Sequence, residues 1–285
     1  MDFTEIPIGV MQGRLLPKYN GRYQAHPVGN WKSEFQIAQS LGLSRIEFIL
    51  DFDGAEENPL LKIGGDSEIN VACESTSVQV KSICADYFMA SPMHVGTVVE
   101  RSRSIDVLSR LISTANAIGV TDIVIPCVDE SSLGGVEAMQ NFAAAIKPNI
   151  KLAEDARVNL CLETDLDPQN FLSLLELIDS KAVTVNYDIG NSASLGYDPI
   201  EEFSAYGTVI SDIHVKDRIL KGSSVVLGSG SANFERFFSA LRKVDYQGAF
   251  ILQVFRDDEG LGIFKSQLDW FRDRLQVVSR KMNGK

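Results

Sequence analysis

Polar residues end several otherwise apolar, strand-like runs of this sequence, and these side chains have the clearest capacity for chemistry. In chain order they are Gln12, Glu47, Asp86, Glu163, Asp188, His214 and Gln253. Glu163, Asp188 and His214 end three successive runs, and two carboxylates with one imidazole suit a hard or borderline divalent cation. Each residue alone is better explained by a helix cap, a loop anchor or a strand-end hydrogen bond. Three on consecutive runs favour a metal site.

The runs that must position these residues are short and rich in Val and Ile. Each is followed by a turn and then by a segment with helical periodicity, which is typical of βαβ units. We predict eight strands, at 6–11, 45–50, 78–84, 122–128, 159–164, 184–188, 211–215 and 250–255. Eight strands close a (β/α)8 TIM barrel, in which the strand carboxyl ends line the active-site mouth. We therefore predict an α/β fold with a single barrel domain over 1–285, and keep a doubly wound open sheet as the alternative.

Helix signals follow three of the predicted strands. Asp167-Pro168 and Asp198-Pro199 each place an N-cap before a proline at the first helical position, and Asn233 precedes a third helix. The apolar stripes of these helices predict packing against the barrel. The connections at 15–29 and 51–72 are longer than usual, so we predict that they lie over the catalytic face as lids.

Composition narrows the class of protein. A net charge of -11 disfavours nucleic-acid and membrane-surface partners, because it repels phosphate backbones and anionic lipids. The start MDFTEIPIGV has no basic segment followed by an apolar one, and no apolar run approaches a membrane span. The four cysteines show no paired spacing, which favours reduced thiols. We expect a cytoplasmic protein that acts on a small molecule.

Several motifs resemble those of the xylose-isomerase-like family of sugar-phosphate isomerases and epimerases. They are GVMQGRL (9–15), NLCLE (159–163), VNYDIGN (185–191), DIHVKD (212–217) and LGSGSANF (227–234). The resemblance implies one divalent metal ion, Mn, Mg, Co or Zn, held by Glu163, Asp188 and His214. The fourth ligand position of that family falls on Gln253, where the family has glutamate. The resemblance also implies an isomerase, with a possible homo-oligomer.

Glutamine at position 253 changes the expected chemistry. Its amide oxygen can ligate a cation, but it adds no charge and accepts no proton near neutral pH. A two-base epimerisation would therefore lack one base, whereas aldose-ketose isomerisation through an enediolate needs a single base and a metal-stabilised oxyanion. We predict isomerisation, with Glu163 as base and Lys216 as a second catalytic residue.

The substrate is predicted to be a sugar or a sugar phosphate. Substrate contacts are predicted for Gln12, Arg14, Glu47, Asp86, Asn191, Arg218 and Arg256. A phosphate site is one interpretation of Lys216 and Arg218 with the glycines of 228–230, because backbone amides and a cation favour an anion. The equal alternative is that Lys216 pairs with Asp217 or Glu47 while the glycines only form the turn before Asn233.

Three other functions compete with a sugar isomerase. A metal-dependent endonuclease would need several metal ions, many histidines and a basic groove, which three histidines and this charge do not supply. A dehydratase of an inositol-like or sugar-acid substrate would use the same enolate chemistry with loss of water. A non-catalytic sugar-binding barrel would explain Gln253 as decay of the active site.

Overall fold

The computed structural model describes residues 2–283. Its eight parallel strands close into a barrel in the order β1-β10-β7-β6-β5-β4-β3-β2. The strands are β1 (Ile8–Met11), β2 (Arg45–Ile49), β3 (Ser82–Cys84), β4 (Asp122–Cys127), β5 (Asn159–Thr164), β6 (Val183–Asp188), β7 (Ile210–Val215) and β10 (Phe250–Leu252). The predicted (β/α)8 barrel is confirmed, and the open sheet is excluded.

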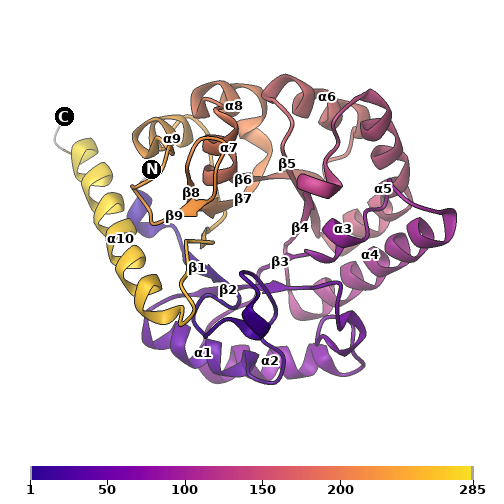
Figure 1. Cartoon of the computed structure of the whole chain (residues 1–285), viewed down its shortest axis with the longest axis horizontal. Helices are drawn as coiled ribbons and strands as arrows, with labels where there is room; N and C mark the ends of the chain where they lie inside the picture. Colours follow the sequence, from indigo (N-terminus) through magenta and orange to yellow (C-terminus); the bar gives the residue numbers. More distant parts are fainter. Residues whose placement is uncertain (1, 284–285) are drawn as a thin grey trace. The chain divides into compact units, whose positions relative to one another are not determined.

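Helices separate the strands along the chain (Figure 1). The α-helices are α1 (Trp31–Ser40), α2 (Gly65–Thr76), α3 (Tyr87–Ala90), α4 (Val98–Ile118), α5 (Val136–Ala156), α6 (Pro168–Ile178), α7 (Ile189–Leu195), α8 (Pro199–Tyr206), α9 (Phe234–Leu241) and α10 (Leu261–Asn283). The 3-10 turns are η1 (Phe3–Glu5), η2 (Tyr19–Gly21), η3 (Ala55–Glu57), η4 (Asp129–Ser131) and η5 (Gly207–Val209). A small antiparallel hairpin of β8 (Asp217–Arg218) and β9 (Ser224–Val225) follows β7.

The chain divides into two compact units. The first comprises the residues before Glu47 and after Asn186, and the second comprises 47–186. In the first unit, β10 pairs with both β1 and β7, with Phe250 opposite Ile8 and Ile213. Phe237 and Phe238 of α9 are buried and their rings contact Phe250, so the predicted apolar stripe of this helix packs inward.

The second unit contains the run β3-β4-β5 and the two long helices α4 and α5, which pack side by side (Figure 1). Every residue of β4 is buried. Full burial is expected for a parallel strand covered on both faces, and it explains why this run is apolar on consecutive residues.

The three predicted N-caps are confirmed. The Asp167 carboxylate accepts from the amides of Gln169 and Asn170 at the start of α6. Asp198 accepts from Ile200 at α8, and Asn233 accepts from Arg236 at α9. These short polar side chains satisfy amides that the first helical turn leaves without an internal partner, which fixes where each helix begins.

Three of the predicted boundaries are wrong by more than two residues. The third strand, β3, begins at Ser82 rather than at residue 78. The segment 51–72 is not one long connection, because α2 begins at Gly65 inside it. The last barrel strand ends at Leu252 rather than at residue 255, because the Val254 carbonyl accepts from the Arg14 side chain instead of a neighbouring strand. The connection 15–29 contains only the turn η2, as predicted, and its role as a lid stays a prediction.

None of the four cysteines forms a disulfide. Among the helices of residues 2–283, none combines the length and apolarity that crossing a membrane requires.

Candidate metal centre and catalytic site

Asp188 and His214 belong to the first unit and lie at the ends of β6 and β7. Asp188 is also the N-cap of α7, and its Oδ1 accepts from the Asn191 amide at 2.8 Å. Its Oδ2 lies 4.0 Å from Nδ1 of His214, and both side chains are buried. Capping α7 therefore uses Oδ1 of Asp188, while Oδ2 of the same carboxylate faces the His214 imidazole.

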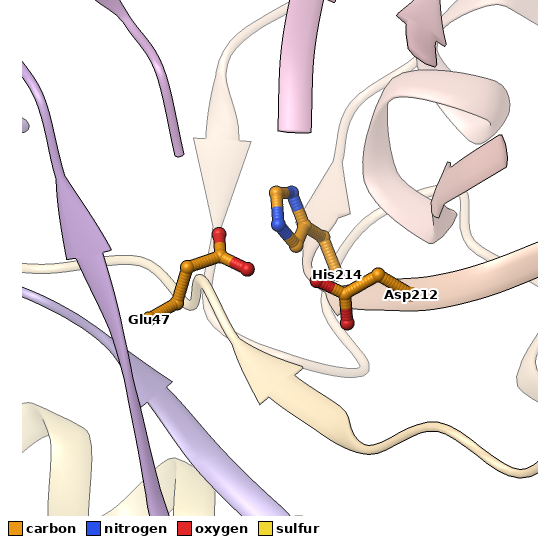
Figure 2. A group of neighbouring side chains, drawn as sticks. All are labelled: Glu47, Asp212 and His214. Carbon is orange, nitrogen blue, oxygen red and sulfur yellow. The ribbon is translucent and has the colours of Figure 1, made fainter. Parts of the chain in front are cut away.

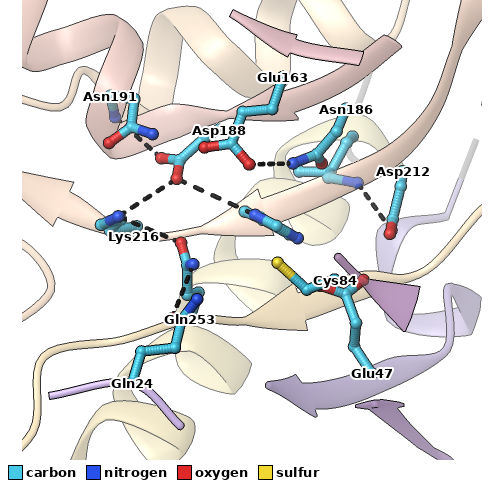
Figure 3. A network of polar contacts seen from close by, with 12 residues as sticks. Gln24, Glu47, Cys84, Glu163, Asn186, Asp188, Asn191, Asp212, Lys216 and Gln253 are labelled. Atoms are coloured by element: carbon cyan, nitrogen blue, oxygen red, sulfur yellow. Dashed lines mark hydrogen bonds and ion pairs between the residues drawn. The ribbon is translucent and has the colours of Figure 1, made fainter. Parts of the chain in front are cut away.

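Lys216 lies two residues beyond His214, and Figure 3 shows its ammonium between Asp188 and Gln253. Its Nζ is 3.4 Å from Asp188 Oδ2 and donates to Gln253 Oε1 at 3.2 Å. The Gln253 amide in turn donates to Gln24 Oε1 at 3.0 Å. Gln253 stands at the family's fourth ligand position, and its amide oxygen accepts a hydrogen bond from Lys216.

Glu163 belongs to the second unit and lies near the end of β5. Its Oε2 accepts from Nδ2 of Asn186 at 2.9 Å, and its side chain is buried. The unit contains another buried acid, Glu47 of β2, which accepts from Ser82 Oγ of β3 at 2.5 Å. Burial, together with Asp86, Glu47 and Glu163, raises the pKa of the Cys84 thiol well above its usual range. Cys84 is therefore a neutral thiol that donates to Asp86.

Glu163, Asp188 and His214 each offer a ligand atom within 4.8 Å of the other two. Two carboxylate oxygens and one imidazole nitrogen form a donor set that Zn²⁺ or Mn²⁺ accepts. The three residues chosen from the sequence as metal ligands are therefore brought together.

A second group with the same 4.8 Å spacing consists of Glu47, Asp212 and His214 (Figure 2). Asp212 was not predicted from the sequence, because it lies in the middle of β7 and only polar residues at strand ends were considered. The alternation of side chains along a strand could have predicted it, because residues two apart, such as Asp212 and His214, lie on the same face of β7.

The other predicted substrate contacts have protein partners in the structure. Gln12 Oε1 lies 2.9 Å from Nδ1 of His26, and burial lowers the pKa of His26 to about 4, so this imidazole is neutral at pH 7. Arg218 donates to Asn191 Oδ1 at 2.8 Å. Contact of these residues and of Glu47 and Asp86 with a substrate stays a prediction.

Arg14 and Arg256 are buried side chains that hold connections in place. Arg14 donates to the Val254 carbonyl at 3.1 Å, and Arg256 donates to the carbonyls of Gly13 and Leu16 at 2.6 and 2.7 Å. Their guanidinium groups join the connection after β1 to the connection after β10. These bonds support a structural role beside the predicted role in substrate binding.

Glu202 is a buried carboxylate next to the candidate site that sequence reasoning missed. It accepts from the hydroxyls of Tyr187, Ser192 and Tyr206. Tyr187 directly precedes Asp188 and Ser192 lies in α7, so this cluster fixes the start of the helix that Asp188 caps. An isolated glutamate in a helical segment carries no sequence signal for such a role.

Glu34 is a fully buried glutamate of α1 that holds the turn after β1. Its carboxylate oxygens accept from the Gly13 amide at 2.7 and 2.9 Å and from the Leu15 amide at 3.3 Å. Burial raises the pKa of Glu34 from 4.5 to about 7, although the amides of Gly13 and Leu15 and the guanidinium groups of Arg256 and Arg14 lower it.

We expect Glu34 to make unfolding depend on pH between about 4.5 and 7. A raised pKa means that the folded protein binds the proton more tightly than the unfolded chain, so the stabilisation is complete below pH 4.5 and is lost as the pH rises through 7. The shift corresponds to at most about 3 kcal/mol. Urea unfolding at several pH values should show this decline in the wild type and a flatter profile in Glu34→Gln; equal slopes would contradict it.

These observations define a class of protein: a (β/α)8 barrel with buried carboxylate and imidazole side chains on successive strands. The family model for the xylose isomerase-like TIM barrel matches residues 29–274. The chain belongs to this family, as its motifs predicted.

The proteins similar to this chain include several that are named as sugar epimerases. The L-ribulose-5-phosphate 3-epimerase UlaE of Escherichia coli (strain K12 / DH10B) is 23% identical over 288 residues, covering 95% of each chain. The solved structure of an L-ribulose 3-epimerase matches with a TM-score of 0.76 at 14% identity, over 98% of this chain and 97% of that one. The IOLI protein, crystallised with a zinc atom, matches with a TM-score of 0.76 at 15% identity, over 96% and 99% of the two chains. Homologues of this chain are therefore isomerase-class enzymes.

Proposed function

We propose that this protein is a metal-dependent sugar isomerase that moves a proton between carbons next to a carbonyl group. The observation that carries the proposal is the group of Glu163, Asp188 and His214, whose ligand atoms lie within 4.8 Å of one another. Neutral imidazole and ionised carboxylates fit Mn, Mg, Co or Zn, with Mg the least suited to a histidine ligand.

Asp188, His214 and Glu163 would hold the divalent ion, which when bound stabilises negative charge on a substrate oxygen. Glu163 would be the base that removes the proton from carbon, since its Oε2 accepts from the neutral amide of Asn186, whereas Oδ2 of Asp188 is paired with Lys216. Lys216 carries this cation beside Asp188 and Gln253, where it can donate a proton or a hydrogen bond to a substrate oxygen. The buried surroundings exclude water from the proton while it is transferred.

Gln253 favours isomerisation over epimerisation within this class. Its amide oxygen accepts from Lys216, and an amide takes up no proton near neutral pH. One carboxylate can still return the proton to the neighbouring carbon on the same face of an enediolate. Epimerisation is the second candidate: relatives are named as epimerases, and Lys216, which donates to Gln253, would serve as the second proton donor.

Solvent deuterium exchange tests the proposal. The protein, loaded with Mn²⁺ and incubated in D₂O with a panel of ketoses and their phosphates, is expected to exchange a substrate proton, and NMR of the products should show an aldose. A C3 epimer instead would identify an epimerase, and a product lighter by one water would identify a dehydratase. Tight sugar binding without exchange or bound metal would identify a non-catalytic barrel, and would overturn the proposal.

A further inference from the structure

Gln24 lies in the connection after β1 and contacts the candidate site through the side chain of Gln253 (Figure 3). Its Oε1 accepts from Nε2 of Gln253 at 3.0 Å and from Nη2 of Arg14 at 2.9 Å. The oxygen of the same Gln253 amide accepts from Nζ of Lys216, which lies 3.4 Å from Oδ2 of Asp188. All of these residues belong to the first unit. A continuous line of hydrogen bonds therefore runs from Arg14 to a candidate metal ligand.

The two cations in this line fix the orientation of both amides. Ammonium and guanidinium groups only donate, so Lys216 requires the oxygen of Gln253, and Arg14 requires the oxygen of Gln24. The NH2 group of Gln253 is then left for the Gln24 oxygen, which accepts two hydrogen bonds, as a carbonyl oxygen can. Turning either amide by half a rotation would place one donor against another donor, which costs both hydrogen bonds.

This line of hydrogen bonds gives Gln253 a role that a glutamate could not fill in the same geometry. An ionised carboxylate at position 253 would set an acceptor against the Gln24 oxygen, because a carboxylate only accepts. Gln24 could turn to donate to it only by aiming its own NH2 group at the Arg14 guanidinium. The glutamine at the family's fourth ligand position is therefore matched by Arg14 and Gln24. Decay of an active site would require no such match.

Gln24 is held on a fixed segment of the chain. Arg14 is almost fully buried, donates to the Tyr23 carbonyl at 3.3 Å, and lies 5.2 Å from the centre of the Tyr23 ring. The Tyr23 hydroxyl accepts from the Arg256 amide at 3.3 Å, which joins this segment to the connection after β10. A side chain on a fixed segment can restrict its neighbour, so Gln24 can hold the Gln253 amide in one orientation.

We infer that Gln24 is a positioning residue for the proposed reaction. Its oxygen orients the Gln253 amide, and that amide holds the Lys216 ammonium in place. The inference rests on the proposed function, in which Lys216 donates to a substrate oxygen. Without Gln24, the Gln253 side chain can turn, and Lys216 gains other directions for its hydrogen bonds. Misplacing a group that acts on the reacting atoms lowers kcat more than it changes KM.

Two substitutions of Gln24 separate its acceptor oxygen from its bulk. Gln24→Met keeps the length of the side chain and removes the oxygen, so kcat for deuterium exchange should fall by about 10- to 100-fold while KM changes by less than about threefold. Gln24→Glu keeps an acceptor for Arg14 and Gln253 and should retain about a third or more of the wild-type kcat. The matched control is Gln247→Met, which changes an exposed glutamine of the same unit and should leave kcat within about twofold.

Two results of this series would overturn the inference. One is an unchanged kcat in Gln24→Met, and the other is a loss in Gln24→Glu as large as the loss in Gln24→Met. A double-mutant cycle then tests the route through Lys216. In a Lys216→Met background, Gln24→Met should lower the remaining rate by less than about twofold. A further tenfold loss in that background would show that Gln24 acts by another route, and would also overturn the inference.

An NMR measurement tests the orientation of Gln253 without activity. The side-chain amide signals of Gln253 are assigned by their loss in Gln253→Met. Gln24→Met should move these signals and speed their exchange with solvent by about tenfold or more, whereas Gln24→Glu and Gln247→Met should leave the exchange slow. Signals that Gln24→Met leaves unmoved would overturn the inference. If the signals respond as expected but the wild type exchanges no substrate proton, the result counts against the proposed reaction, while Gln24 still orients Gln253.

Discussion

Glu163→Gln is expected to lower kcat by about 10²- to 10⁴-fold, because it removes the general base while keeping the shape of the side chain. Asn186 can still donate to the remaining amide oxygen, as it does to Glu163 Oε2 at 2.9 Å, so the barrel should stay folded. The deuterium exchange rate measures the effect, and the Tm reports on folding.

The matched control is Glu176→Gln, an exposed glutamate of α6 in the same unit. It makes the same change of charge away from the strand ends and should leave kcat within about twofold of the wild type. If Glu163→Gln retained a tenth or more of the wild-type rate, Glu163 could not be the base.

His214→Ala should lower the affinity for Mn²⁺ or Zn²⁺ by more than about 100-fold, since losing even a group that only orients a ligand costs about 10- to 100-fold. Elemental analysis after dialysis and competition with a chelator would measure the change. Asp188→Asn is the second variant, and is needed because His214 is fully buried and its truncation can also destabilise the barrel.

Gln253→Ala is the internal comparison for the metal. The Gln253 oxygen accepts from Lys216, so its removal should change metal affinity by less than about tenfold. A loss through Gln253→Ala as large as through His214→Ala would make Gln253 a true fourth ligand. Unchanged affinity in both His214→Ala and Asp188→Asn would refute the metal centre.

Much of the fold follows from local sequence signals. Runs such as Asp122–Cys127 predict buried strands because covered parallel strands are apolar on consecutive residues. Asp167 with Pro168 predicts a helix start because the amides of the first turn have no partner within the helix. The Asp167 side chain accepts from two of them, and proline has no amide hydrogen. The start of α2 at Gly65 could not be predicted in this way, because its first turn has no side-chain cap and its stripe is weakly amphipathic.

The candidate site was predictable only in part, for a similar reason. Polar ends of apolar strands led to Glu163, Asp188 and His214, whose ligand atoms lie within 4.8 Å of one another; their role in a metal site stays a prediction. Partners in distant segments were not predictable. The pairing of Arg256 with the Gly13 carbonyl, and of Asp217 with the amides of 228–232, depends on how connections fold back, which no local periodicity encodes.

The first unit is built from both ends of the chain, with β1 paired to β10 and Arg14 bonded to a carbonyl 240 residues away. The second unit is one continuous stretch, 47–186, whose contacts span shorter separations. During synthesis the continuous stretch can fold while the ribosome is still extending the chain, but β1 must wait, without its strand partner β10, until the last segments emerge. The pairing of β1 with β10 can therefore form only after Phe250–Leu252 have been synthesised.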